Sequence, residues 1–159
     1  MRYILFTLTL LFSLSSFTQI KKVDQSKEPV VIGKAMSAMY TIATMNKITV
    51  EGMPDYYFVT FDNNKYTEIE DFQSFGFKDI DGAYDYLFNS VAQASKSKKK
   101  EIEFDLEDGR LNVGIVRALG VINVQFNWFE SGVLSYSGYM TPKQFCKLFA
   151  KPYNKKEWK

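Results

Sequence analysis

Residues 102–139 read IEFDLEDGRLNVGIVRALGVINVQFNWFESGVLSYSGY, with apolar and polar side chains alternating along most of the stretch. Successive side chains of a β-strand point to opposite faces of its sheet, so this alternation predicts strands with one apolar face. Three dipeptides that end in glycine interrupt it: Asp108-Gly109, Leu119-Gly120 and Ser131-Gly132. Glycine adopts the positive φ of tight hairpin turns, and the stretch therefore predicts an antiparallel meander of four strands with one buried face.

The third predicted strand decides which side chains face the core. Its apolar residues follow an unbroken period of two: Ile122, Val124, Phe126 and Trp128. A shift of one residue would expose Trp128 and bury the amides between these positions, so the register is expected to be well specified. In the fourth strand the same pattern predicts that Leu134 and Tyr136 face inward. Ser135 and Ser137 then face outward.

Two segments have apolar residues at helical spacing and are predicted to cover the apolar face of the meander. The first begins at Asp81 and reads DGAYDYLFNSVAQAS. Asp79, Asp81 and Asp85 near its start are expected to cap free N–H groups rather than to bind calcium, because the glycine and acid that a calcium loop requires are missing from their positions. The second helix begins with the capping-box pattern TPKQ at residues 141–144.

The N-terminal half predicts further strands. Residues 30–45 mix β-branched and helical patterns, and we favour one long strand over a helix because no cap precedes the segment. Residues 56–61 predict a buried strand, residues 66–71 its return strand and residues 72–77 a further short one. Together these patterns predict a single α+β domain over residues 30–151. About seven antiparallel strands would form a curved sheet or partly open barrel with two packed helices, ordered as three strands, helix, four strands, helix.

The two ends of the chain are expected to lie outside this domain. Residues 1–18 have a basic start, an apolar core and small residues before Gln19, which indicates a secretory signal peptide. A retained anchor helix is the alternative, although the apolar run is short for a bilayer. Residues 19–29 predict a mobile N-terminal arm and residues 152–159 a frayed basic tail. The mature protein is thus expected to be secreted or periplasmic and to have no transmembrane span.

Composition argues against several chemistries. The 159 residues carry 20 Lys and Arg against 18 Asp and Glu, and this near balance does not steer the chain toward nucleic acid. The basic run SKSKKK at residues 95–100 is interpreted as a solvated loop, since no aromatic residues interleave with its lysines. The sequence contains no histidine, and its single cysteine, Cys146, lies on an apolar helix face. We therefore predict no catalytic residues, no metal site and no cofactor.

One surface has an unusual composition for an exposed sheet face. Uncharged polar side chains dominate the outer face of the last two predicted strands, and aromatic residues flank them. The candidate binding residues are Asn123, Gln125, Asn127, Phe129, Ser135 and Tyr139. Amides and hydroxyls beside aromatic rings suit the docking of a partner or a polar ligand. An ordinary solvated face, or one covered by the N-terminal arm, is the alternative interpretation.

The leading functional hypothesis is an exported, non-enzymatic module that binds a protein or a component of the cell envelope. A small-ligand carrier is the first alternative, with an apolar cavity lined by the tyrosines and methionines of residues 30–61. A carboxylate-dependent hydrolase is the second, because acids cluster at residues 68–71 and alternate along residues 101–107.

Overall fold

The computed structural model describes residues 28–66, 68–118 and 120–158, so the predicted signal peptide and most of the predicted arm lie outside the described residues. The first half of the domain contains β1 (Val30–Met36), β2 (Thr41–Ile48), β3 (Tyr56–Asp62), β4 (Phe72–Lys78) and α2 (Ala83–Lys96). The second half contains β5 (Glu101–Leu106), β6 (Gly109–Ala118), β7 (Val121–Glu130), β8 (Val133–Tyr136), α3 (Pro142–Leu148) and the short 3₁₀ helix η1 (Lys155–Trp158). The predicted α+β class and the order of its elements are confirmed.

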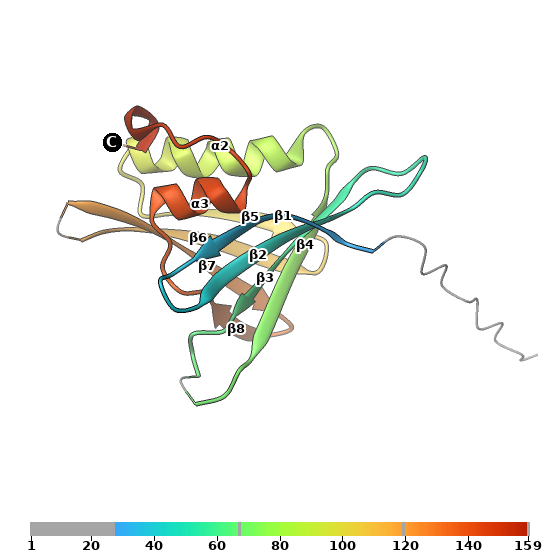
Figure 1. The fold of residues 1–159 in the computed structure, drawn as a ribbon, viewed down its shortest axis with the longest axis horizontal. Helices are drawn as coiled ribbons and strands as arrows, with labels where there is room; N and C mark the ends of the chain where they lie inside the picture. Colours follow the sequence, from blue (N-terminus) through green and yellow to red (C-terminus); the bar gives the residue numbers. More distant parts are fainter. Residues whose placement is uncertain (1–27, 67, 119, 159) are drawn as a thin grey trace, which may run out of the picture.

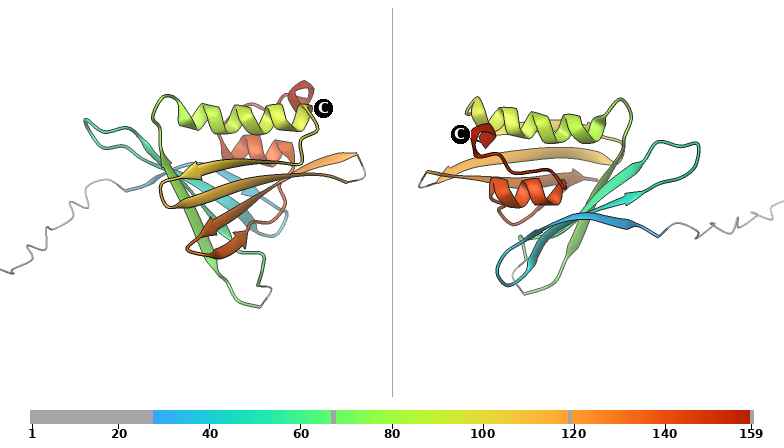
Figure 2. Two further views of the ribbon diagram at one scale, coloured as in Figure 1. Left: turned by 180° about the vertical axis from the view of Figure 1, so that it is seen from behind. Right: turned by 45° about the horizontal axis from the view of Figure 1, so that its top comes forward.

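The strands form two antiparallel meanders rather than one closed barrel. Sheet A has the order β1-β2-β3-β4 and sheet B the order β5-β6-β7-β8. The two sheets cross each other (Figure 1 and Figure 2). Their buried apolar side chains form one core cluster. At their contact, the Phe75 ring of β4 lies 5.2 Å from the Phe126 ring of β7 and 5.8 Å from the Trp128 ring. Trp128 is 1% exposed, which confirms the predicted inward face of β7.

Each helix packs against the sheet that it does not directly follow in sequence, and α3 also packs against its own sheet B. The helix α2 follows sheet A and contacts β5 and β6, whereas α3 follows sheet B and contacts β1, β2 and β7 (Figure 1). Most of the predicted apolar stripe of α2 is buried, including Leu87 and Val91, while its first residues are half-buried. Phe145 and Leu148 of α3 are fully buried. This exchange of helices ties the two halves together, because neither sheet is covered by its own helix alone.

Sequence reasoning was wrong about two segments of sheet A. Residues 30–45 form parts of two strands, because the chain reverses between Ser37 and Tyr40, where the Ser37 N–H donates to the Tyr40 carbonyl at 2.9 Å. Residues 66 and 68–71 belong to a loop, and the return strand is β4. The Asn63 N–H donates to the Asp71 carbonyl at 2.7 Å across the base of this loop, so pairing resumes at Phe72. The sheets therefore contain eight strands where about seven were predicted.

The hairpin between β5 and β6 turns one residue earlier than predicted. Leu106 pairs with Gly109, so Glu107 and Asp108 form the turn. Gly109 has no positive φ, in contrast to Gly132 of the next hairpin, whose φ is 84°. A Cβ at Gly109 would lie 2.5 Å from the Phe129 carbonyl oxygen and 2.8 Å from the Trp128 ring. Glycine is required at this position for close approach to β7 rather than for turning the chain.

The start of α3 is as the sequence predicted, and that of α2 is so only in part, because its N-cap residue is Gly82, which makes no side-chain cap hydrogen bond. The Asp79 carboxylate accepts the Tyr84 N–H at 3.0 Å at the start of α2. In α3 the Thr141 side chain accepts from the Gln144 N–H, and the Gln144 side chain accepts from the Thr141 N–H at 2.7 Å. These bonds satisfy donors that the first helical turn leaves without partners.

The C-terminal segment is packed rather than frayed. Trp158 is 3% exposed, and its ring lies 5.5 Å from the Phe145 ring and 6.4 Å from the Phe88 ring. Burial of a large aromatic side chain contributes several kcal/mol, which offsets part of the entropy cost of ordering the chain end. The basic residues of η1 stay outside while its tryptophan closes the core between α2 and α3.

Candidate functional site

The predicted binding surface forms only in part, and strand β7 supplies most of it. Asn123, Gln125 and Asn127 lie half-buried on the outer face of sheet B, and Phe129 is 47% exposed at the end of the row. The Gln125 side chain donates to the Ser137 carbonyl at 2.8 Å, and the Asn127 side chain donates to the Asn112 side-chain oxygen at 3.2 Å. These amides therefore bind one another and the backbone, which leaves fewer of their groups for a ligand.

Ser135 does not belong to this surface. The two-residue turn after Glu130 pairs Trp128 with Ser135, and directly opposed residues of an antiparallel pair share a face. Since Trp128 faces inward, Ser135 is buried at 2% exposure and Leu134 faces outward at 47%. Ser137 is buried as well, and its hydroxyl accepts the Phe126 N–H at 3.0 Å. The turn fixed the register here against the hydrophobicity of β8.

Tyr139 lies beyond β8, in the connection to α3. Its side chain is 53% exposed. The next residue, Met140, pairs with Val124 through two backbone hydrogen bonds of 2.8 Å. Of the six predicted residues, the structure therefore places four along β7, one in the core and one in this connection.

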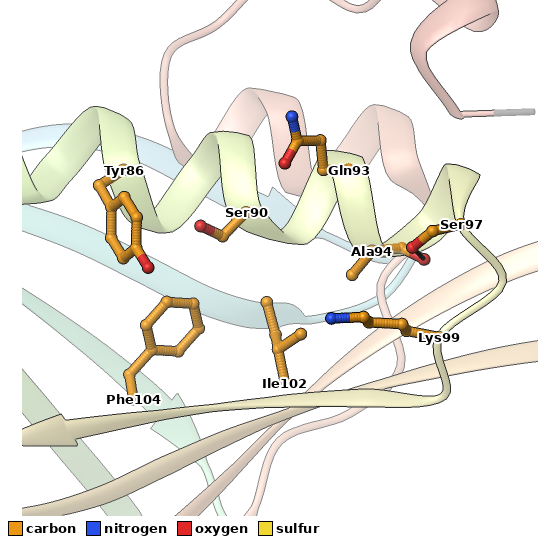
Figure 3. Close-up of a pocket in the computed structure, with 8 residues that line it drawn as sticks. All are labelled: Tyr86, Ser90, Gln93, Ala94, Ser97, Lys99, Ile102 and Phe104. Atoms are coloured by element: carbon orange, nitrogen blue, oxygen red, sulfur yellow. Dashed lines mark hydrogen bonds between the residues drawn. The ribbon is translucent and has the colours of Figure 1, made fainter.

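A second surface, which sequence reasoning missed, lies between α2 and the edge strand β5. A pocket of about 510 Å³ opens there, and an adjoining pocket of about 330 Å³ shares Tyr86 and Phe104 with it. We call the two pockets together the α2–β5 groove. Figure 3 shows Tyr86 of α2 pointing toward Phe104 of β5, and the Lys99 side chain extending toward Ile102 near the end of the helix.

Helical spacing explains the upper wall of the groove. Leu87 and Val91 point into the core, and the neighbouring stripe of α2 carries smaller and polar side chains. This stripe consists of Tyr86, Ser90, Gln93 and Ser97. Residues three and four apart lie on one helix face, so the stripe lies beside the core and above the edge of β5. The Tyr86 ring meets the Phe104 ring edge-on at 6.2 Å and is itself 66% exposed.

Strand β5 supplies the floor and a free backbone edge. It is the first strand of sheet B, and among the described residues it pairs with β6 alone. The Ile115 N–H donates to the Lys100 carbonyl at 2.6 Å. The even-numbered residues of β5 are therefore the ones whose backbone groups bond to β6. Antiparallel pairing alternates bonded and non-bonded positions. The N–H and C=O groups of Glu101, Glu103 and Asp105 therefore point away from β6 and toward the groove side.

The two faces of β5 differ in charge. Ile102, Phe104 and Leu106 are half-buried on the groove face, and the acids between them are exposed on the outer face. Asp105 pairs with Arg110 at 3.3 Å, whereas Glu101 and Glu103 accept hydrogen bonds only from Asn112 among the described side chains, at 3.2 and 3.5 Å. A ligand that lies along β5 therefore meets an apolar side and an anionic side.

The outer end of this acidic row is paired with sheet A. Glu107 accepts from Lys78 at 2.8 Å, and this hydrogen bond lowers the pKa of the Glu107 carboxyl. A hydrogen bond from Lys47 likewise lowers the pKa of Asp55, which lies 2.5 Å from it. A general acid of glycoside hydrolysis requires a shift in the opposite direction. The two carboxyls thus have the wrong electrostatics for that role.

Other chemistry-bearing groups are directed into the core. Cys146 is buried, and burial raises the pKa of its thiol, which disfavours the nucleophilic thiolate. Within residues 28–158 as described, no three His, Cys, Asp or Glu side chains converge to hold a metal ion. Tyr57 belongs to the segment that was expected to line a ligand cavity, but its ring stacks on Tyr84 at 4.5 Å and on Phe77 at 5.9 Å. Its ring is thus a packing element.

Comparison with family models, with curated proteins and with solved structures gave no match to this chain. Over the described part of the chain, no helix has both the length and the apolar character needed to cross a membrane. The α2–β5 groove and the outer face of sheet B are the two surfaces of the described residues whose geometry suits binding.

Proposed function

We propose that the protein is an exported, non-enzymatic binding module that binds a partner protein or a component of the cell envelope through the α2–β5 groove. One observation carries the proposal. The groove, which contains pockets of about 510 and 330 Å³, runs beside a strand edge whose backbone groups pair with no described strand. Exposed strand edges of this kind bind other chains readily, and most proteins cover or disrupt them.

The groove supports this function better than the polar face of β7 does. Gln125 and Asn127 each already donate one side-chain N–H to an internal hydrogen bond. The groove instead combines half-buried apolar side chains, an exposed aromatic ring at Tyr86 and free backbone groups. Apolar anchors with a few directed polar groups are the usual composition of binding sites. The β7 face then borders the site and is not its centre.

Export rests on the sequence of residues 1–18, which has the three-part pattern of a secretory signal. Expression of the full chain in the organism that encodes it tests this part. Mass spectrometry of the secreted or periplasmic fraction should detect a mature chain that begins at or near Gln19. Recovery of the chain with an intact N-terminus in the cytoplasm would contradict export while leaving the binding site open to test.

Three variants of the mature chain test the binding surface. Ser90→Arg places a long charged side chain in the groove, Gln125→Arg with Asn127→Arg alters the β7 face, and Lys143→Glu changes an exposed position on α3 as a control. Each variant is first checked for unchanged unfolding by circular dichroism, and then compared with wild type in pull-downs from the native host. Loss of the same captured component from Ser90→Arg alone supports the groove. Retention of every component by Ser90→Arg contradicts it.

A further inference from the structure

We infer that the occupant of the α2–β5 groove is an extended segment of a partner protein with alternating apolar and basic residues, and that this segment adds to sheet B as an antiparallel strand beside β5. The inference rests on the proposed function, since it names the chemistry of the partner for the same groove. Strand addition to a free sheet edge is a common mode of peptide recognition. It takes affinity from backbone bonds and specificity from alternate side chains.

The backbone of β5 provides the first part of the argument. The N–H and C=O groups of Glu101, Glu103 and Asp105 point away from β6, as the pairing of β5 with β6 requires. The edge of β8 differs, because Asn63 and Asn64 of the β3–β4 loop bond to both backbone groups of Tyr136, at 3.2 and 2.8 Å. In sheet B, the open edge with an adjacent groove is therefore β5.

The groove face of β5 determines which type of side chain suits every second position of the partner segment. An added strand places every second side chain beside Ile102, Phe104 and Leu106 and beneath Tyr86. These side chains are apolar and half-buried, so they favour apolar neighbours. The outer face determines the other half. Glu101 and Glu103 have no cation within ion-pair distance among the described residues, and opposite charges across neighbouring strands stabilise a pair.

The same charges disfavour a second copy of this chain as the occupant. Pairing β5 with its own copy in antiparallel register would place acidic side chains opposite acidic side chains on one face. Like charges directly opposite each other destabilise a strand pair. A segment with lysine or arginine at alternate positions removes this repulsion and replaces it with attraction.

The geometry also determines which backbone groups of the partner bond to β5. Residues that bond directly to Glu101, Glu103 and Asp105 lie opposite them and share their face. The partner's basic residues therefore donate and accept the bonds to β5, whereas the N–H groups of its apolar residues point away. This link between side-chain type and backbone bonding is specific to strand addition, and a groove that binds the same peptide in another conformation would not show it.

The test uses the mature chain and a labelled seven-residue peptide, capped at both ends, in which valine and lysine alternate. Fluorescence anisotropy should detect its binding, and a peptide with glutamate in place of lysine should bind at least tenfold more weakly. Methylation of the lysine backbone nitrogens should abolish binding, whereas methylation of the two central valine nitrogens should weaken it less than threefold. Ser90→Arg should lose the peptide, and Lys143→Glu should bind as wild type does.

A charge exchange gives a matched control for these peptides. The double variant Glu101→Lys with Glu103→Lys changes two exposed positions of β5 and should reverse the preference, binding the glutamate peptide more tightly than the lysine peptide. Equal binding of both peptides by wild type, or equal effects of lysine and valine methylation, would overturn strand addition. If Ser90→Arg still loses its partner in the native host under that result, the proposed function survives without this inference. Self-association of the wild-type chain that Ser90→Arg abolishes would instead identify a second copy as the occupant.

Discussion

Replacement of Asn63 tests how the loop between β3 and β4 joins the two sheets. Asn63 is 1% exposed. Its side-chain nitrogen donates to the Asp71 carboxylate at 2.8 Å, and its side-chain oxygen accepts the N–H groups of Tyr136 and Lys65 at 3.2 and 3.3 Å. The Tyr136 bond crosses from sheet A to the last strand of sheet B. We therefore expect Asn63→Ala to destabilise the whole domain rather than the loop alone.

The expected loss of stability in Asn63→Ala depends on whether water can replace the Asn63 side chain for each of its hydrogen-bond partners. Asp71 is half-buried and keeps the hydrogen bond from Gln73 at 2.8 Å, and Lys65 is exposed, so water replaces Asn63 for both. The Tyr136 N–H is the group left without a partner. A net loss of about 0.5–1.5 kcal/mol for an ordinary hydrogen bond and about 1–3 kcal/mol for an unsatisfied buried donor gives a total of roughly 1.5–4.5 kcal/mol.

Urea unfolding followed by circular dichroism measures this loss, and Asn63→Asp is the matched control. Aspartate keeps the acceptor for Tyr136 but places a second carboxylate against Asp71, which raises the folded-state pKa of the pair above the unfolded value. A raised pKa stabilises the fold below the unfolded pKa and loses this contribution as pH rises through the folded pKa. The Asn63→Asp deficit should therefore grow from pH 4 to pH 7, while the Asn63→Ala deficit stays constant. An Asn63→Ala loss below about 0.5 kcal/mol, or a constant Asn63→Asp deficit, would refute this reasoning.

Three further measurements test the packing of the core and the contribution of Tyr84 to stability at alkaline pH. A Cβ at Gly33 of β1 would overlap the last carbonyl oxygens of α3, so Gly33→Ala should lower the free energy of unfolding by about 1–3 kcal/mol. A Cβ at Gly114 would meet a side-chain amide at 3.3 Å and a carbonyl oxygen at an ordinary contact distance of 3.9 Å, so Gly114→Ala should lower it by less than about 1 kcal/mol. Burial raises the pKa of Tyr84 to about 12, above its unfolded value of 10.0, so stability is retained below pH 10 and falls as pH rises toward 12; this alkaline slope should be shallower in Tyr84→Phe. Trp128 and Trp158 are the two tryptophans of the chain and are both buried, so iodide should quench their fluorescence weakly in the folded protein and strongly in urea.

The second half of the fold was predictable because its strands have one consistently apolar face. Every second residue of β7 is buried as the sequence indicates, and the helix caps at Asp79 and Thr141 form where their patterns occur. The predicted inward face of β8 was wrong because the strand has only four residues. That is too few for hydrophobicity to outweigh the register that the preceding turn imposes. Ser135 is thus buried by its pairing with Trp128, although its own polarity favours the surface.

The α2–β5 groove could not be predicted in the same way, since it depends on where α2 lies over the edge of sheet B. The sequence contained one local signal. Tyr86 is an aromatic residue outside the apolar stripe of its helix, and it is 66% exposed. The alternation of acids and apolar residues along β5 was visible too, but alternation alone does not distinguish an edge strand from a central one. Pairing, which is a property of the folded chain, makes that distinction.

The acidic row of β5 gives the free strand edge a charge that disfavours pairing with a second copy of this chain. Charged side chains along an edge protect against unwanted pairing. A mixture of positive and negative side chains would allow antiparallel self-pairing with opposite charges in contact, whereas the row of Glu101, Glu103 and Asp105 has one sign and repels its own copy. The same uniform sign favours a basic partner. A single feature of the sequence thus provides both protection and selectivity, because the rejected strand and the accepted strand differ in the sign of the charge they present to β5.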